Sequence, residues 1–175
     1  TICEIVNPTN CDTVTATVTV TAPPIDAVAD APPAVNGFTG ATTASVLAND
    51  TLNGAPVNPA AITLTPGTAP TPASGSITMN ASGTITVAPG TTAGTYTYPY
   101  TICENLNPGN CDTATITVTL APPAIIAVDD SYGPVNGTTG DPSVGNAIDN
   151  DTLNGAPVNI ADITVSVLTP ASDPG

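Results

Sequence analysis

Four cysteines carry the most specific chemistry in this chain, and they form two pairs of equal spacing. Cys3 and Cys11 bracket one short loop, and Cys103 and Cys111 bracket another. Two cysteines that face each other across a hairpin can meet disulfide geometry. A zinc ion would need four ligands, whereas each loop offers two thiols and no His. We therefore predict the disulfides Cys3–Cys11 and Cys103–Cys111, each worth roughly 2–3 kcal/mol, and an oxidising compartment for the protein.

The acidic residues are the second group with possible chemistry. The chain has 14 Asp and Glu residues and no Lys, Arg or His, which gives a formal net charge of −14. Clustered acids without cationic partners must repel one another, take up protons or bind metal cations. The candidate Ca2+ ligands form two sets: Asp129, Asp130, Asp149, Asn150 and Asp151, and Asp30, Asn49 and Asp50. The alternative is a solvated acidic face that keeps the protein soluble.

The composition argues against catalysis, nucleic-acid binding and membrane insertion. Without His or Lys, the usual base for a Ser or Cys nucleophile is missing. Paired carboxylates can hydrolyse glycosides, but here they lie on repeated turns without an aromatic platform for a sugar. We predict that the protein is not an enzyme. No cation is present to neutralise phosphates or anionic lipids, and the apolar runs are too short to span a bilayer.

The chain repeats itself with a period of 100 residues. Residues 1–4 return as 101–104, and residues 49–58 return, after one insertion, as 150–159. Internal repeats of domain size indicate an array. We interpret residues 1–21 as the C-terminal hairpin of a preceding repeat, 22–121 as a complete repeat and 122–175 as the N-terminal part of the following repeat. The chain is then a window of a longer protein, or a protein whose ends are completed by neighbours.

Each repeat reads as strands and turns. Thr, Val and Ile alternate with a period of two, which is typical of half-buried strands, in the following segments: 13–21, 76–79, 84–87, 95–102 and 113–120. About seven short strands in about 100 residues are typical of an immunoglobulin-like sandwich. The predicted fold class is all-β, with tandem immunoglobulin-like Greek-key β-sandwich repeats of about 100 residues. Pro23-Pro24 and Pro122-Pro123 predict short, semi-rigid joints.

Residues 93–118, with the cysteine hairpin, and residues 49–54 and 83–89 resemble the repeats of giant Bacteroidota cell-surface adhesins of the SprB-like, gliding-motility type. Asp129-Asp130 and Asn150-Asp151-Thr152 are similar, more loosely, to bacterial cadherin-like repeats, in which such acids often bind calcium. The resemblance implies a cell-surface filament, exported through the type IX secretion route, that attaches cells to a substratum.

The resemblance also gives a reading for a recurring Asp-Thr-aliphatic sequence, which looks like the O-glycosylation motif of that phylum. The implied acceptors are Thr13, Thr51, Thr113 and Thr152. The alternative is a plain strand-edge turn, since Asp stabilises turns.

We therefore expect the structural stalk or fibre of an extracellular bacterial surface adhesin. The alternative is a self-assembling extracellular fibre subunit that is completed by strands from neighbouring copies. A third reading, a sugar-binding module on a secreted enzyme, needs an exposed row of aromatics. Tyr96, Tyr98 and Tyr100 alternate on the expected strand 95–102 and are assigned to the core, so only Phe38 and Tyr132 lie elsewhere. The expected partners are neighbouring repeats, identical chains, and surface glycans or a substratum, with no nucleic acid and no membrane insertion.

Overall fold

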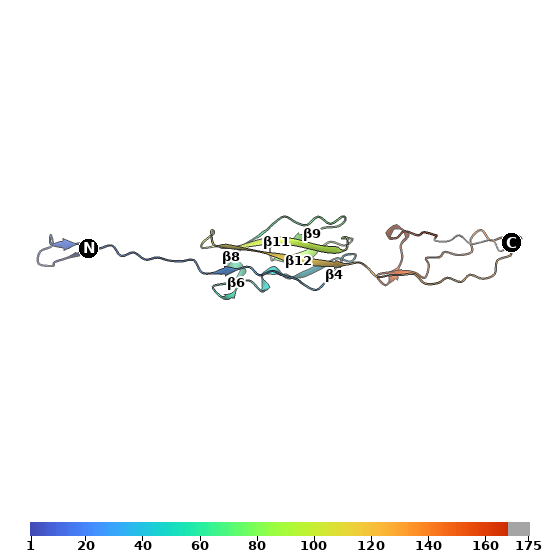
Figure 1. The fold of residues 1–175 in the computed structure, drawn as a ribbon, viewed down its shortest axis with the longest axis horizontal. Helices are drawn as coiled ribbons and strands as arrows, with labels where there is room; N and C mark the ends of the chain where they lie inside the picture. The colour runs from blue at the N-terminus through green and yellow to red at the C-terminus, as the bar shows by residue number, and fades with distance from the viewer. Residues whose placement is uncertain (168–175) are drawn as a thin grey trace.

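The computed structural model describes residues 1–167 as an elongated, all-β molecule (Figure 1). A small hairpin lies at the N-terminal end, a two-sheet unit lies in the middle, and a second small sheet follows toward the C-terminus. Within these residues, no helix has the length and apolar character needed to cross a bilayer.

The two-sheet unit is an immunoglobulin-like β-sandwich. One sheet has the order β5-β10-β9, with bounds Ala41–Ser45, Thr84–Val87 and Ile77–Met79. The other has the order β4-β12-β11-β8, with bounds Val35–Asn36, Cys111–Ala121, Gly94–Glu104 and Ile62–Pro66. The strands are antiparallel except that β4 runs parallel to β12. The chain changes sheet from β4 to β5, from β5 to β8, from β8 to β9 and from β10 to β11, and this confirms the predicted fold class.

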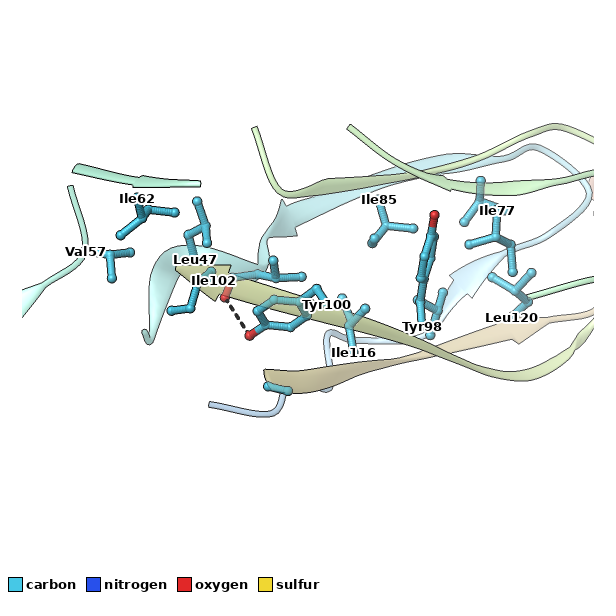
Figure 2. Packing of buried hydrophobic residues seen from close by; sticks show 14 residues of the cluster. Leu47, Val57, Ile62, Ile77, Ile85, Tyr98, Tyr100, Ile102, Ile116 and Leu120 are labelled. Carbon is cyan, nitrogen blue, oxygen red and sulfur yellow. Dashed lines mark hydrogen bonds between the residues drawn. The ribbon is translucent and has the colours of Figure 1, made fainter. Parts of the chain in front are cut away.

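The core lies between the sheets and follows the alternation of the two long strands. On β11, Tyr98, Tyr100 and Ile102 point inward and are buried, while Pro99 and Thr101 between them lie on the other face and are half-buried. Ile116 and Leu120 of β12 continue this layer (Figure 2). The facing side is filled by the following side chains of the other sheet and the turn after β5: Ile77, Ile85, Val87, Val46 and Leu47. Each large aliphatic side chain buried here contributes about 1.5–3 kcal/mol.

A small accessory sheet closes the N-terminal end of the sandwich. It has the order β3-β6-β7, with bounds Ile25–Asp26, Thr51–Leu52 and Ala55–Pro56. Asn53 and Gly54 connect β6 to β7 with φ angles of 56° and 74°, as expected for the Asn-Gly turn that favours tight hairpins. Two short 3-10 turns flank this sheet, η1 (Val46–Ala48), capped by Ser45, and η2 (Pro59–Ala61), capped by Asn58.

The same local structure recurs in the C-terminal part of the chain. The strands β13, β14 and β15 form a sheet in that order, with bounds Ile125–Ile126, Thr152–Leu153 and Ala156–Pro157. Asn154 repeats the positive φ of Asn53, and η3 (Ile160–Asp162) repeats η2. The sequence repeat is therefore a structural repeat as well.

The N-terminal segment corrects one prediction. The hairpin of β1 (Ile2–Cys3) and β2 (Cys11–Asp12) forms as expected, but residues 13–21 form no strand, although 113–121 belong to β12. Val18 is 82% exposed, whereas its counterpart Val118 is 1% exposed. A strand needs a neighbouring strand with which it exchanges backbone hydrogen bonds, and it is stabilised further where another layer covers its apolar face. In the described structure β4 and β11 exchange hydrogen bonds with β12 and the facing sheet covers its apolar side chains, whereas no strand pairs with residues 13–21.

Candidate functional site

Both predicted disulfides are present. Cys103 and Cys111 lie directly opposite each other in the β11–β12 register, with their Cα atoms 4.1 Å apart. Cys3 and Cys11 occupy the same positions in the β1–β2 hairpin, also with a Cα distance of 4.1 Å. The sequence prediction is confirmed because the register of each hairpin brings the two thiols face to face.

The loop closed by the Cys103–Cys111 disulfide is held by a buried carboxylate. Glu104 is largely buried, and its Oε2 accepts hydrogen bonds from the side-chain amides of Asn107 (2.8 Å) and Asn110 (3.1 Å). Asn110 also donates to the carbonyl oxygen of Pro23 (2.8 Å). The loop is thus fastened to the segment that enters the sandwich.

The N-terminal copy of this loop repeats the arrangement. The side-chain amides of Asn7 (2.9 Å) and Asn10 (3.0 Å) donate to Oε2 of Glu4. The hydrogen bonds from Asn10 and Asn7 lower the pKa of the Glu4 carboxyl. The sequence prediction missed this carboxylate clamp, although the equal spacing of Glu, Asn and Asn in the two loops is a usable signal.

A second polar group lies inside the sandwich, around the hydroxyl of Tyr100. Four oxygens surround it: Val28 O at 3.0 Å, Asp50 Oδ1 at 3.1 Å, Asp30 Oδ2 at 3.2 Å and Val46 O at 3.4 Å. The bond to Val46 is the dashed line in Figure 2. Asp50 Oδ1 also accepts from the backbone N–H of Val28 at 2.8 Å. This Tyr100 group, which consists of the Tyr100 hydroxyl and these four oxygens, joins β11 to the segment after β3, to the start of η1 and to Asp50 after η1.

This group has more acceptors than hydrogens. Tyr100 has one hydroxyl hydrogen, and Oδ2 of Asp50 has no hydrogen-bond partner among the described residues. Burial raises the pKa of the Asp50 carboxyl, and the nearby charges of Asp26 and Asp112 raise it further. Burial also raises the pKa of Asp30. A proton on one of these carboxyls would supply the missing hydrogen.

The same burial acts on the phenol. It raises the pKa of Tyr100, and the adjacent charges of Asp50 and Asp30 add to this effect. The phenol therefore stays protonated and keeps its single hydrogen for the surrounding acceptors.

The candidate Ca2+ ligands are only partly brought together. Asp30 and Asp50 meet at the Tyr100 hydroxyl, and Asn49 lies beside them, with its amide 3.4 Å from Val28 O. In the later set, Asp151 accepts from Val128 N (2.8 Å), as Asp50 does from Val28 N. Across residues 1–167, no three His, Cys, Asp or Glu side chains gather in a way that could hold a metal ion.

The other members of the later set have separate contacts. Asp149 accepts from the amide of Asn146 at 2.6 Å, and the Asn150 amide donates to the backbone oxygen of Asp129 at 3.3 Å. Asp130 lies in the exposed segment after β13. The described side chains thus form no ready cage of carboxylates, and calcium binding stays a prediction.

The four candidate glycosylation residues all lie near strand ends. Thr13 and Thr113 are exposed, and their hydroxyls contact those of Thr1 (2.9 Å) and Thr101 (3.0 Å) across the hairpin. Thr51 and Thr152 begin β6 and β14 and are half-buried. The structure places Thr13 and Thr113 where a glycan would extend into solvent.

One of the solved structures to which the chain is slightly similar is that of a bacterial surface protein. It is a SusE-like, surface-located polysaccharide-binding protein from the heparin utilisation locus of Bacteroides thetaiotaomicron. The match has a TM-score of 0.41 and 16% sequence identity, and it covers 60% of this chain but 16% of that protein. A likeness of this size supports no statement about binding. No curated protein matches the chain.

The family model named Bacterial Ig domain matches residues 21–119, which is more than half of the chain. The matched range contains the sandwich except the last two residues of β12, together with the disulfide hairpin and the Tyr100 group. The chain therefore belongs to the bacterial Ig domain family.

Proposed function

We propose that this chain is part of the stalk of an extracellular bacterial surface adhesin, in which Ig-like repeats follow one another to create length. The observation that carries the proposal is the repetition of structure along one line. The β3-β6-β7 sheet of the sandwich unit returns as β13-β14-β15 in the following part of the chain, and the disulfide hairpin of β11 and β12 occurs once more at the N-terminal end (Figure 1). Repetition along one line is typical of quasi-linear repeat proteins, in which a repeat contacts only its neighbours in sequence.

The chemistry of the surface supports a spacer function. Only single aromatic side chains, Phe38 and Tyr132, are partly exposed away from β11. The polar groups with unusual environments, Glu104 and the Tyr100 group, are tied up in contacts within the repeat. They serve the rigidity of the module, and a separate part of the protein would supply the contact with surface glycans or a substratum.

A display experiment tests this function. A binding domain of known ligand is placed on one, two, four and eight copies of residues 22–121 at a bacterial surface that carries a capsule. Adhesion to ligand-coated beads should rise as the array outgrows the capsule, and arrays without the binding domain should show none. Adhesion that is independent of copy number, or that bare arrays also show, would contradict the stalk.

The exposed apolar face of residues 13–21 favours a second candidate, a fibre subunit completed by strands from a neighbouring copy. Val14, Val18 and Val20 are all more than four-fifths exposed, although their counterparts in β12 are buried. Such a segment fits the edge of an incomplete sheet. Light scattering of the purified chain across a concentration series separates the two candidates, since a stalk segment stays monomeric and a self-completing subunit polymerises.

The gliding-motility type of adhesin, calcium binding and glycosylation extend this proposal. Calcium held by the Asp129–Asp151 set would stiffen the start of a repeat, and it should raise the melting temperature relative to a sample in EGTA. An unchanged melting temperature would contradict calcium binding. Intact mass of the protein from its own cells tests the acceptors, because substituting Thr113 by Val should remove one glycan mass if that residue is modified.

A further inference from the structure

The joint between the sandwich and the next sheet is only two residues long. The carbonyl oxygen of Ala121 accepts from Gly37 N in the sandwich (3.1 Å), and the carbonyl oxygen of Ala124 accepts from Asn154 N in the following sheet (2.7 Å). Pro122 and Pro123 alone separate these two fixed points, which span roughly 10 Å at most. Because each proline ring fixes φ, the joint has little freedom of its own.

In the described part of the chain, one side-chain hydrogen bond crosses this joint. The amide nitrogen of Asn36, at the end of β4, donates to Oδ1 of Asn154, in the turn between β14 and β15, at 2.8 Å. Oδ1 of Asn36 accepts from Phe38 N at 2.9 Å, which fixes the amide in its own turn. Asn154 binds the linker through its backbone N–H and the preceding sandwich through its side chain. It therefore connects the sandwich, the linker and the following sheet.

Both partners of this bridge recur in the sequence. Asn36 returns as Asn136 within Val-Asn-Gly, and Asn154 is the repeat of Asn53. Asn53 has the same positive φ as Asn154 and the same backbone bond to the linker, with its N–H 2.7 Å from Pro24 O. Asn136 Oδ1 accepts from Thr138 N at 2.8 Å, just as Asn36 does from Phe38 N. Each repeat thus has an Asn hydrogen-bond donor on the side that faces the next repeat, and an Asn hydrogen-bond acceptor on the side that faces the preceding repeat.

We propose that the Asn36–Asn154 bridge is the docking contact between successive repeats and sets the angle between them. The partner of this surface is the next repeat of the same kind. Asn136 offers the donor to a following repeat, and Asn53 offers the acceptor to a preceding one. A contact between two different ends of identical modules is heterologous and therefore propagates as an open array. The inference rests on the proposed stalk function and adds the contact that joins its successive repeats.

Substitution by Asp gives a sharp test, because Asp keeps the oxygen that serves the local turn and tolerates positive φ. In N36D, the Asn154 amide can turn and donate to the new carboxylate. In N154D, the Asn36 amide donates to a carboxylate, so each single variant keeps the bridge. In N36D/N154D, two carboxylates face each other without a donor and must separate.

The measurement is the distribution of distances between two spin labels in the full chain. The labels sit on genetically encoded non-cysteine residues at Thr97 and Ala161, which are exposed in β11 and η3, so the disulfides stay intact. Wild type and both single variants should give one narrow distribution. The double variant should give a distribution at least twice as broad, while the melting temperature of the sandwich stays within 2 °C of wild type.

A double variant as narrow as wild type would overturn the bridge. Single variants as broad as the double variant would also overturn it, since the local turns and not the contact would then set the angle. The outcomes of this distance measurement test the bridge alone and do not decide whether the protein is a stalk. An array can gain length with each repeat while its joints use another contact, and adhesion that ignores copy number would refute the stalk whatever the joint does.

Discussion

The hydroxyl oxygen of Tyr100 lies 3.1 Å from Oδ1 of Asp50, a residue with 0% exposure in a chain that has no cationic side chain. The bond ties β11 to the segment after η1. Burying an ionised carboxylate without a cation is costly. The Tyr100 group therefore makes the stability of the sandwich depend on protonation.

The first prediction is that the sandwich is more stable at pH 4 than at pH 7. Burial raises the folded-state pKa of Asp50 and of Asp30 above the ordinary value of 3.8. An acid with a raised folded-state pKa adds stability that is fully present below its unfolded-state pKa and is lost as pH rises through the folded-state pKa. Urea unfolding followed by tyrosine fluorescence should therefore give a higher midpoint at pH 4.

Asp50→Asn is the matched test of this pH dependence. The amide mimics the protonated acid, so the difference between the midpoints at pH 4 and pH 7 should shrink. Asp162→Asn removes a charge from an exposed position in η3 and should leave the difference as it is. A sandwich that gains stability from pH 4 to pH 7 would show that the Tyr100 group does not act in this way.

The second prediction concerns the Tyr100 hydroxyl. Tyr100→Phe leaves the two carboxyls without their shared donor, so the free energy of unfolding should fall by about 1–3 kcal/mol at pH 7. Tyr98→Phe is the control, because Tyr98 points inward from the same strand but is not part of this group. Chemical denaturation of both variants measures the difference. Equal losses would mean that the hydroxyl contacts of Tyr100 carry no particular weight.

The third prediction separates the two disulfides. Replacing Cys103 and Cys111 by Ser should lower the free energy of unfolding of the sandwich by about 2–3 kcal/mol, since β11 and β12 are its central strands. Replacing Cys3 and Cys11 by Ser removes the equivalent disulfide from a hairpin that pairs with no other strand of the described structure, and the melting temperature of the sandwich should stay unchanged. Calorimetry of the two double variants measures the melting temperature of the sandwich in each. A comparable decrease in both would show that the N-terminal hairpin stabilises the sandwich.

The fourth prediction compares two equivalent valines. Val118→Thr places a hydroxyl in the core and should cost about 1–3 kcal/mol. Val18→Thr changes a side chain that is 82% exposed and should alter stability by less than about 0.5 kcal/mol. Thermal melts measure both. A large loss for Val18→Thr would show that residues 13–21 pack against the rest of the chain in solution.

The sequence was sufficient to predict the two long strands, which carry strong alternation, but not β8, although Ile62 and Leu64 alternate with Thr there. Tyr, Ile and Val at every second position of β11 and β12 predicted both strands and their buried faces. The segment Ala41–Ser45 was missed because it has no large apolar residue. Its inward position is occupied by Thr43, whose hydroxyl accepts from Ile85 N at 3.2 Å. Only the neighbouring strand β10 makes this segment a strand.

Residues 13–21 are the opposite case, a segment in which the local pattern predicts a strand that the structure does not form. They alternate as clearly as 113–121, but alternation predicts a strand only where partners exist. Alternation of apolar residues shows that a segment can form a strand, and the presence of neighbouring strands determines whether it does so.

The site was predictable where its residues are close in sequence. The disulfides follow from cysteines at the two ends of one short loop. The sequence also grouped Asp30 with Asp50, but it assigned Tyr100 only to the core, because a contact over a separation of 50 residues cannot be read from spacing. The bridge from Asn36 to Asn154 spans 118 residues and was equally hidden.

The most direct test of the stalk is the maximum dimension, by small-angle X-ray scattering, of arrays with one, two, four and eight copies of residues 22–121. Our account predicts that each added repeat extends the particle by the same length, so the maximum dimension rises in a straight line with copy number. A maximum dimension that levels off, or that grows only as the cube root of copy number as in a compact globule, would contradict it.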